Sequence, residues 1–175
     1  MIHIISALFL RELKTRFGKN RKLGYFWVIG EPMLNILFFL IIVTLIRAQS
    51  IPQVPFTMFL VTGIVPFFMF KNIITQIIAG VSANTALLAY KPVKPIHIFI
   101  ARAFLEVCIY SFVFVLFMIA FGWFLDLTII PANFLEVVIA FIGLALLGFS
   151  LGVCLAFLSS ELEYSQIFIN YGLNI

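Results

Sequence analysis

Four long apolar segments constrain this chain more than any other feature of its sequence. They run over about residues 26–46, 56–79, 98–125 and 135–158. A helix needs about 20 consecutive apolar residues to cross the hydrocarbon core of a bilayer, so each segment is long enough to span it. Only 10% of the 175 residues are charged, against about 25% in soluble domains, so lipid must cover much of the apolar surface. The sequence therefore predicts an all-α polytopic membrane protein.

A further apolar stretch runs from Ile167 to the last residue, Ile175. It is too short to cross a bilayer as a helix, and we expect it to be the start of a fifth span. The whole chain, residues 1–175, is then a single membrane domain.

The Lys and Arg residues are unequally divided among the stretches that flank these segments. They gather before the first segment and between the second and the third. The connection between the first and the second carries only Arg47, and that between the third and the fourth carries none. Because cytoplasmic loops are enriched in Lys and Arg, we expect the N-terminus and residues 81–95 in the cytoplasm. Residues 47–55 and 126–134 are expected on the opposite side.

Residues 1–24 are predicted to form an amphipathic helix followed by a basic linker. On a helical wheel the shared apolar face holds Ile2, Ile5, Phe9, Leu13 and Phe17. Arg11 and Lys14 lie away from that face, whereas Arg16 lies near it and must extend its charge to water. A basic amphipathic helix of this kind lies in the membrane interface. The sequence leaves open whether it only anchors the N-terminus.

Ionisable residues inside the apolar segments are costly and usually face protein or water. Glu31, which precedes Pro32, could accept hydrogen bonds from backbone groups that the proline frees, or could contact a cargo. Lys71 could extend its charge to the headgroups, or could line a pathway for an anionic cargo. Arg102 and Glu106 are four residues apart on one predicted helix, so we expect them to form a structural ion pair.

Small residues recur every four positions in the last segment, at Gly148, Gly152 and Ala156. Such a row allows the backbones of two helices to approach closely, and it therefore predicts helix packing.

Motifs for catalysis are missing from the sequence. It has no Gly-rich loop of the GxxxxGK[ST] type for phosphate. Its two histidines, His3 and His97, lie far apart in the sequence and have no acid or nucleophile at a spacing typical of a metal site or a triad. We expect neither an enzyme, nor a metal site, nor a cofactor in this chain, and no nucleic-acid partner.

The stretch between the second and third segments is more elaborate than a turn requires. Asn84 can cap a short helix that carries Leu87, Leu88 and Tyr90, which Pro92 would end. Pro95 can then occupy the first turn of the third span. A short rigid segment at the membrane surface is suited to docking on a soluble partner. The residues assigned to this coupling segment are Asn84, Leu87, Leu88, Tyr90, Lys91, Pro92, Val93, Lys94 and Pro95.

Three stretches resemble the permease subunit of capsular-polysaccharide ABC exporters, whose family includes O-antigen and teichoic-acid permeases. They read LFLRELKTRFGKNRKLGYFWVIGEP, FLVTGIVPFFMF and NTALLAYKPVKPIHIFIARAFLE. The resemblance implies a six-span inner-membrane subunit that forms a homodimer. It implies two partner ATPase subunits, which would bind the ATP and Mg, and a coupling helix at residues 84–95. It also implies an interface helix, for which the notable residues are Phe9, Arg11, Leu13, Arg16 and Phe17.

The resemblance further implies a wide pathway lined by aromatic side chains, on which sugar rings stack. The candidates by residue type are Tyr25, Trp27, Glu31, Phe67, Phe68, Phe70 and Lys71. Each of the aromatic residues among them could equally face lipid or the protein core. The family pattern continues after the position of Ile175 with a complete fifth span, outer re-entrant helices and a sixth span, so we expect this chain to be either a fragment of a longer subunit or a truncated product.

The expected function is the membrane subunit of an ATP-driven exporter of lipid-linked capsular polysaccharide, working with periplasmic and outer-membrane components. One alternative is an O-antigen or teichoic-acid permease. An alternative of another class is a membrane scaffold or assembly protein that transports nothing.

Overall fold

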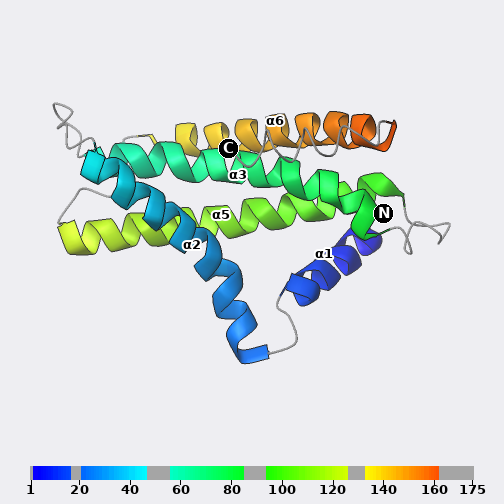
Figure 1. The fold of residues 1–175 in the computed structure, drawn as a ribbon, viewed down its shortest axis with the longest axis horizontal. Helices are drawn as coiled ribbons and strands as arrows, with labels where there is room; N and C mark the ends of the chain where they lie inside the picture. The colour runs from blue at the N-terminus through cyan, green and yellow to red at the C-terminus, as the bar shows by residue number, and fades with distance from the viewer. Residues whose placement is uncertain (1, 17–20, 47–55, 85–93, 126–132, 162–175) are drawn as a thin grey trace.

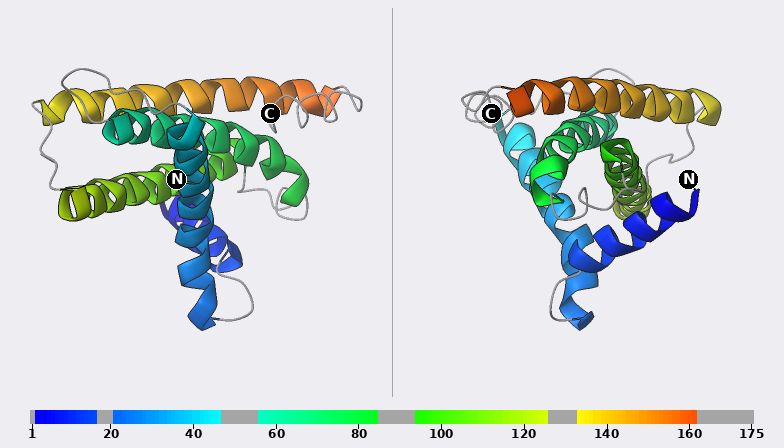
Figure 2. Two further views of the ribbon diagram at one scale, coloured as in Figure 1. Left: turned by 60° about the vertical axis from the view of Figure 1, so that its left-hand side comes forward. Right: turned by 90° about the vertical axis from the view of Figure 1, so that its right-hand side faces the viewer.

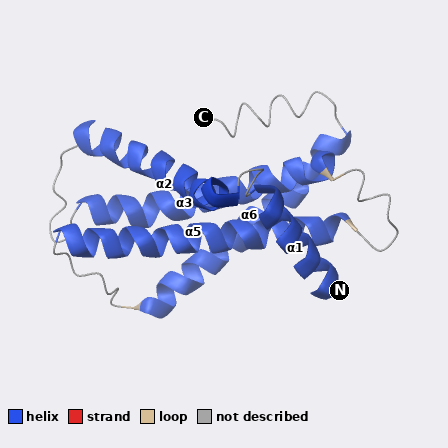
Figure 3. Cartoon of the chain, turned by 90° about the horizontal axis from the view of Figure 1, so that it is seen from below, coloured by secondary structure: helices blue, strands red, loops and turns tan. Residues whose placement is uncertain are grey.

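The structure is a computed structural model, and it describes residues 2–16, 21–46, 56–84, 94–125 and 133–161. Every element in these ranges is a helix (Figures 1 and 3). The helices are α1 (Ile2–Arg16), α2 (Arg21–Ile46), α3 (Phe56–Ala83), α5 (Pro95–Leu125) and α6 (Phe134–Glu161). The last four are long and apolar enough to cross a membrane. The prediction of an all-α polytopic protein, with spans in these four regions, is confirmed.

Helix α3 is central to the arrangement. It makes its most extensive contacts with α5 and α6, which contact each other much less, so α3 lies between them (Figure 1). Helix α2 crosses the α3–α5 pair, and α1 packs against the beginning of α5 at the edge of the long helices (Figure 2).

The core follows one stripe of α3. Its members recur every four residues, and none is exposed to solvent: Val61, Val65, Met69, Ile73 and Ile77. Residues four apart lie on the same face of a helix, so this stripe can contact α2, α5 and α6 along its whole length. In lipid the surroundings are as apolar as the core, and the helices are therefore held by close packing and by interhelical hydrogen bonds.

Two prolines lie within spanning helices. Pro32 does not start a new helix, because α2 continues through it, although α2 changes direction along its length (Figure 1). Pro66 lies inside the continuous helix α3 and is buried. Proline removes one backbone hydrogen bond and displaces the carbonyl four residues earlier, which is the usual cause of such a bend.

Helix α5 begins at Pro95, as the sequence predicts. The backbone N–H of Lys94 donates to Nδ1 of His97 at 3.2 Å, and the His97 N–H donates to the Lys94 carbonyl at 3.0 Å. These reciprocal bonds resemble a capping box, with histidine in the place of the usual Glu or Gln.

Candidate functional sites between the spanning helices

A polar cavity lies between α2, α3 and α5, inside the apolar spans. Its volume is about 350 Å³. Its walls are formed by Trp27, Val28, Glu31, Pro32, Asn35, Asn72, Gln76, Glu106, Ile109 and Tyr110. Polar groups in a bilayer are costly and usually mark the path of a substrate or an ion, so this cavity is the main candidate site.

Each of the three helices supplies its polar residues to the cavity at a spacing of four. Helix α2 contributes Trp27, Glu31 and Asn35; helix α3 contributes Asn72 and Gln76; helix α5 contributes Glu106 and Tyr110. Side chains four residues apart stand one above the other on one face of a helix. The cavity is thus formed by three polar rows that face one another.

The cavity wall is joined between α3 and α5 by a hydrogen bond from Nδ2 of Asn72 to Oη of Tyr110. Tyr110 and Glu106 are almost fully buried, whereas Glu31 and Trp27 are exposed at the side of α2. Carboxylates and amide oxygens accept hydrogen bonds, and the amide nitrogens donate them. The cavity can therefore hold a ligand rich in hydroxyl groups, and the exposed indole of Trp27 offers a flat apolar face beside it.

A second polar cluster joins α1 to the end of α3 and the beginning of α5. Nε of Arg102 lies 3.0 Å from Oε1 of Glu12, and both side chains are largely buried. Nη1 of Arg102 also donates to the carbonyl of Gln76 at 3.0 Å. The predicted pair of Arg102 with Glu106 is wrong, because the guanidinium turns toward α1, which supplies its carboxylate from 90 residues away in the sequence.

Asn84 completes this cluster. Its Oδ1 accepts from Nη1 of Arg11 at 3.1 Å, and its Nδ2 donates to the Gly80 carbonyl at 3.0 Å and more weakly to Oε1 of Glu12 at 3.4 Å. We predicted that Asn84 would cap a following helix, but the side chain instead bonds back to the last turn of α3 and to α1. We call the group Arg11, Glu12, Asn84, Arg102 and the Gln76 carbonyl the polar junction.

Comparison with known proteins identifies relatives of this chain, although no family model matches it. It is 42% identical over 152 residues to the polysialic acid transport protein KpsM of Escherichia coli, which covers 85% of this chain and 57% of KpsM. It is 29% identical over 160 residues to the capsule polysaccharide export inner-membrane protein BexB of Haemophilus influenzae, covering 91% of this chain and 60% of BexB.

The chain is therefore similar in sequence to capsule polysaccharide export proteins. This confirms the resemblance found in the sequence. A more distant relative is the O-antigen export system permease protein RfbA of Myxococcus xanthus, at 34% identity over 80 residues, or 46% of this chain and 28% of RfbA. The chain spans less than two thirds of the length of each of these export proteins.

The proposed pathway residues do not gather at one place. Trp27 and Glu31 line the polar cavity. Phe67 lines a separate, mostly apolar hollow of about 420 Å³ with other residues of α3. Phe68 contacts the rings of Phe39 and Phe67 edge-on, with centroids 6.3 Å apart in each case.

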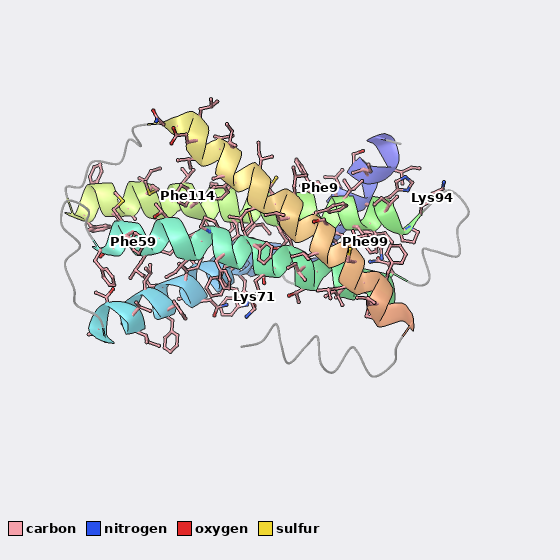
Figure 4. All side chains as sticks on the ribbon, turned by 90° about the horizontal axis from the view of Figure 1, so that it is seen from above. Phe9, Phe59, Lys71, Lys94, Phe99 and Phe114 are labelled. Atoms are coloured by element: carbon pink, nitrogen blue, oxygen red, sulfur yellow. The ribbon has the colours of Figure 1, made fainter. Side chains whose placement is uncertain are left out.

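The other three pathway candidates also differ in their surroundings. Phe70 packs against α6 near Gly148, and so it takes part in helix packing. Lys71 is half-buried about midway along the bundle, between the labelled Phe59 and Phe99 (Figure 4), and it is not among the residues that line the polar cavity. The side chain of Tyr25 lies outside the part of the chain that the structure describes.

Helix α1 covers Ile2–Arg16, and its packing refines the predicted apolar face. Ile4, Ile5, Leu8 and Phe9 pack on Ile98 and Ala101 of α5. Phe9 also contacts the ring of Phe104, and with Leu13 it lines a small apolar cavity of about 200 Å³ between α1, α2 and α5. The helical wheel missed Leu8 and Glu12, which are both buried against α5. Arg16, apart from its backbone, and Phe17 lie outside the described residues.

The small-residue row of α6 lies against α3 in the structure. A Cβ atom built on Gly148 would lie 3.3 Å from the Phe70 carbonyl oxygen, and one built on Gly152 would lie 3.3 Å from the Cα of Ile74. Ala156 is buried in the same interface. The row therefore packs two helices of one chain together.

Most of the predicted coupling segment lies outside the described residues. This holds for Leu87, Leu88, Tyr90, Lys91, Pro92 and Val93. Asn84, Lys94 and Pro95 are described, and they form the end of α3 and the start of α5. The coupling role of the segment stays a prediction.

Proposed function

We propose that this chain is the membrane-spanning part of an ATP-driven exporter that moves lipid-linked capsular polysaccharide across the bacterial inner membrane. The names of its relatives support this assignment: KpsM is a polysialic acid transport protein, and BexB is a capsule polysaccharide export inner-membrane protein. Four helices able to span a membrane fit such a role.

The observation that carries the proposal is the polar cavity between α2, α3 and α5. Its volume of about 350 Å³ is within the range of small-molecule sites, about 300–1,000 Å³. Its side chains can accept and donate hydrogen bonds to sugar hydroxyls, and Trp27 can stack on a sugar ring. A protein that only anchored other proteins would have no need to place Asn35, Asn72 and Gln76 within apolar spans.

The energy for export would come from a partner. We propose that a cytoplasmic ABC ATPase binds ATP and Mg and docks on the segment around residues 84–95, and that two copies of the permease form the pathway. The N-terminus and this segment would then be cytoplasmic. Periplasmic and outer-membrane components would receive the polymer, and this chain itself would catalyse no reaction.

The test is export by cells whose only copy of this subunit carries a change in the cavity. Glu31→Gln and Asn35→Leu should leave the amount of protein in the membrane unchanged and lower the surface polysaccharide, while polymer accumulates inside the cell. The matched control is Phe38→Ala, which removes an exposed side chain of α2 that does not line the cavity. Normal export by both cavity variants would show that the cavity does not handle cargo.

An O-antigen cargo is a second candidate, which the similarity to RfbA favours. The same cells distinguish the two cargoes. Loss of this subunit should remove the capsule and leave O-antigen on the surface. Loss of O-antigen with an intact capsule would reverse the assignment, and export of both polymers without the subunit would indicate a protein that transports nothing.

A further inference from the structure

Two rows of residues, one on α3 and one on α5, extend from the polar junction to the polar cavity. Helix α3 presents Asn72, Gln76, Gly80 and Asn84 at a spacing of four, and α5 presents Arg102, Glu106 and Tyr110 at the same spacing. The cavity is at one end of these two rows, with Asn72, Gln76, Glu106 and Tyr110 in its wall. The junction is at the other end, with Asn84 and Arg102. We call the paired rows the polar seam.

Arg102 lies at the junction end of the seam and contacts one residue of the cavity wall. Its Nε bonds to Glu12 of α1, and its Nη1 bonds to the backbone carbonyl of Gln76, a residue that lines the cavity. A Cβ atom built on Gly80 would lie 3.4 Å from Cδ of Arg102, an ordinary van der Waals contact, so the Arg102 side chain lies directly against α3 at this point. The guanidinium is planar and rigid, so its two bonds cannot be adjusted independently.

The charges of the junction fix geometry more than they add stability. A buried ion pair loses its hydration, and replacing both partners by apolar residues is often neutral or stabilising. Removing one partner leaves a buried charge, which is unfavourable. Glu12 also accepts a bond from Asn84, which holds α1 against the last turn of α3. The pair of Glu12 and Arg102 therefore holds α1 against the end of α3 and the beginning of α5.

We propose that Glu12 and Arg102 are positioning residues that transmit a displacement of α1, or of the connection between α3 and α5, to the polar cavity. A movement of the Glu12 carboxylate shifts the Arg102 guanidinium, and with it the Gln76 carbonyl in the wall between α3 and α5. This inference rests on the proposed function, in which an ATPase acts on the same region, and it adds the route by which that action reaches the cargo.

The first experiment measures the reactivity of a thiol placed in the cavity wall, and it does not depend on export. Asn35→Cys places a thiol in the cavity wall, in a chain whose Cys108 and Cys154 are replaced by alanine. Glu12→Gln should change the rate at which a small maleimide alkylates this thiol by about tenfold, the factor that matches loss of one charge-assisted hydrogen bond. Glu136→Gln, which neutralises an exposed carboxylate of α6, is the matched control and should leave the rate unchanged. An unchanged rate in Glu12→Gln would overturn the inference.

The second experiment separates positioning from simple packing. In Glu12→Leu/Arg102→Met the buried ion pair is replaced by two apolar side chains, so membrane abundance and thermal stability should equal those of the unchanged protein or exceed them. The ATPase should still copurify with this variant. Export should fall to about a tenth of that of the unchanged protein, and the ATP consumed per exported polymer should rise. Full export by this double variant would show that the pair only fills space.

The two proposals fail in different ways. Absence of export by the unchanged chain, together with a Glu12-dependent alkylation rate, would refute the proposed function and keep the polar seam. Normal export, together with an alkylation rate that does not depend on Glu12, would support the proposed function and refute the polar seam.

Discussion

Gly152 is the position where the packing of α6 on α3 has the least room. A Cβ atom added there would lie 2.9 Å from Cδ1 of Ile77, 3.2 Å from its Cβ and 3.3 Å from Cα of Ile74. The Cδ1 atom can turn away, but the other two atoms belong to the backbone of α3 or are fixed to it. Gly143, on the same helix, has no atom within 4 Å of an added Cβ. The two glycines therefore form a matched pair.

The magnitude follows from comparing Gly152→Ala with Gly143→Ala. Both changes gain the same helix propensity, about 0.8–1 kcal/mol, which cancels in the comparison. The remaining difference is the overpacking at Gly152, about 1–3 kcal/mol for extra atoms in a close-packed interface. Gly152→Leu should be more harmful, because a whole side chain would separate α6 from α3.

The assay is the free energy of unfolding, measured in lipid bicelles by titration with a denaturing detergent. Insertion into the membrane should be the same for all variants, since none changes the charge or the length of a span. Gly152→Ala should be less stable than Gly143→Ala by the stated amount. Equal stability of the two alanine variants would refute the reasoning, and it would mean that α6 does not pack on α3 through this row.

Three further predictions address topology, docking and the cavity wall. Impermeant maleimide should label Gln49→Cys and Thr128→Cys in intact cells but not Thr85→Cys, because Lys and Arg favour the cytoplasmic side for the segment that contains Thr85. Labelling of Thr85→Cys would contradict this topology. Leu88→Asp should insert normally but lose the copurifying ATPase, since an unpaired charge in an apolar docking cleft costs about 2 kcal/mol; an intact, exporting complex would exclude a docking role. Tyr110→Phe removes the acceptor of a buried hydrogen bond and should lower the unfolding free energy by about 1 kcal/mol, and an unchanged value would show that this bond contributes nothing.

The sequence by itself determined where the spanning helices lie. In hydrocarbon every backbone polar group must be bonded within the protein, so an apolar segment of bilayer length has to be a helix there. The start of α5 could also be predicted from the local sequence, because Pro95 suits the first turn of a helix, where it has no N–H that would need a partner. Close helix packing was predicted from the row of Gly148, Gly152 and Ala156, because this prediction uses only the spacing of residues along one helix.

Only the tertiary structure decided which rows of residues on different helices lie opposite one another. Arg102 has Glu106 one turn away on its own helix, yet its bond goes to Glu12, whose position depends on how α1 packs against α5. The polar cavity was missed for the same reason. The spacing of Asn72 and Gln76 is visible in the sequence, but a four-residue period gives only the face of a helix. Which face of which other helix lies opposite depends on the packing of the whole bundle around α3.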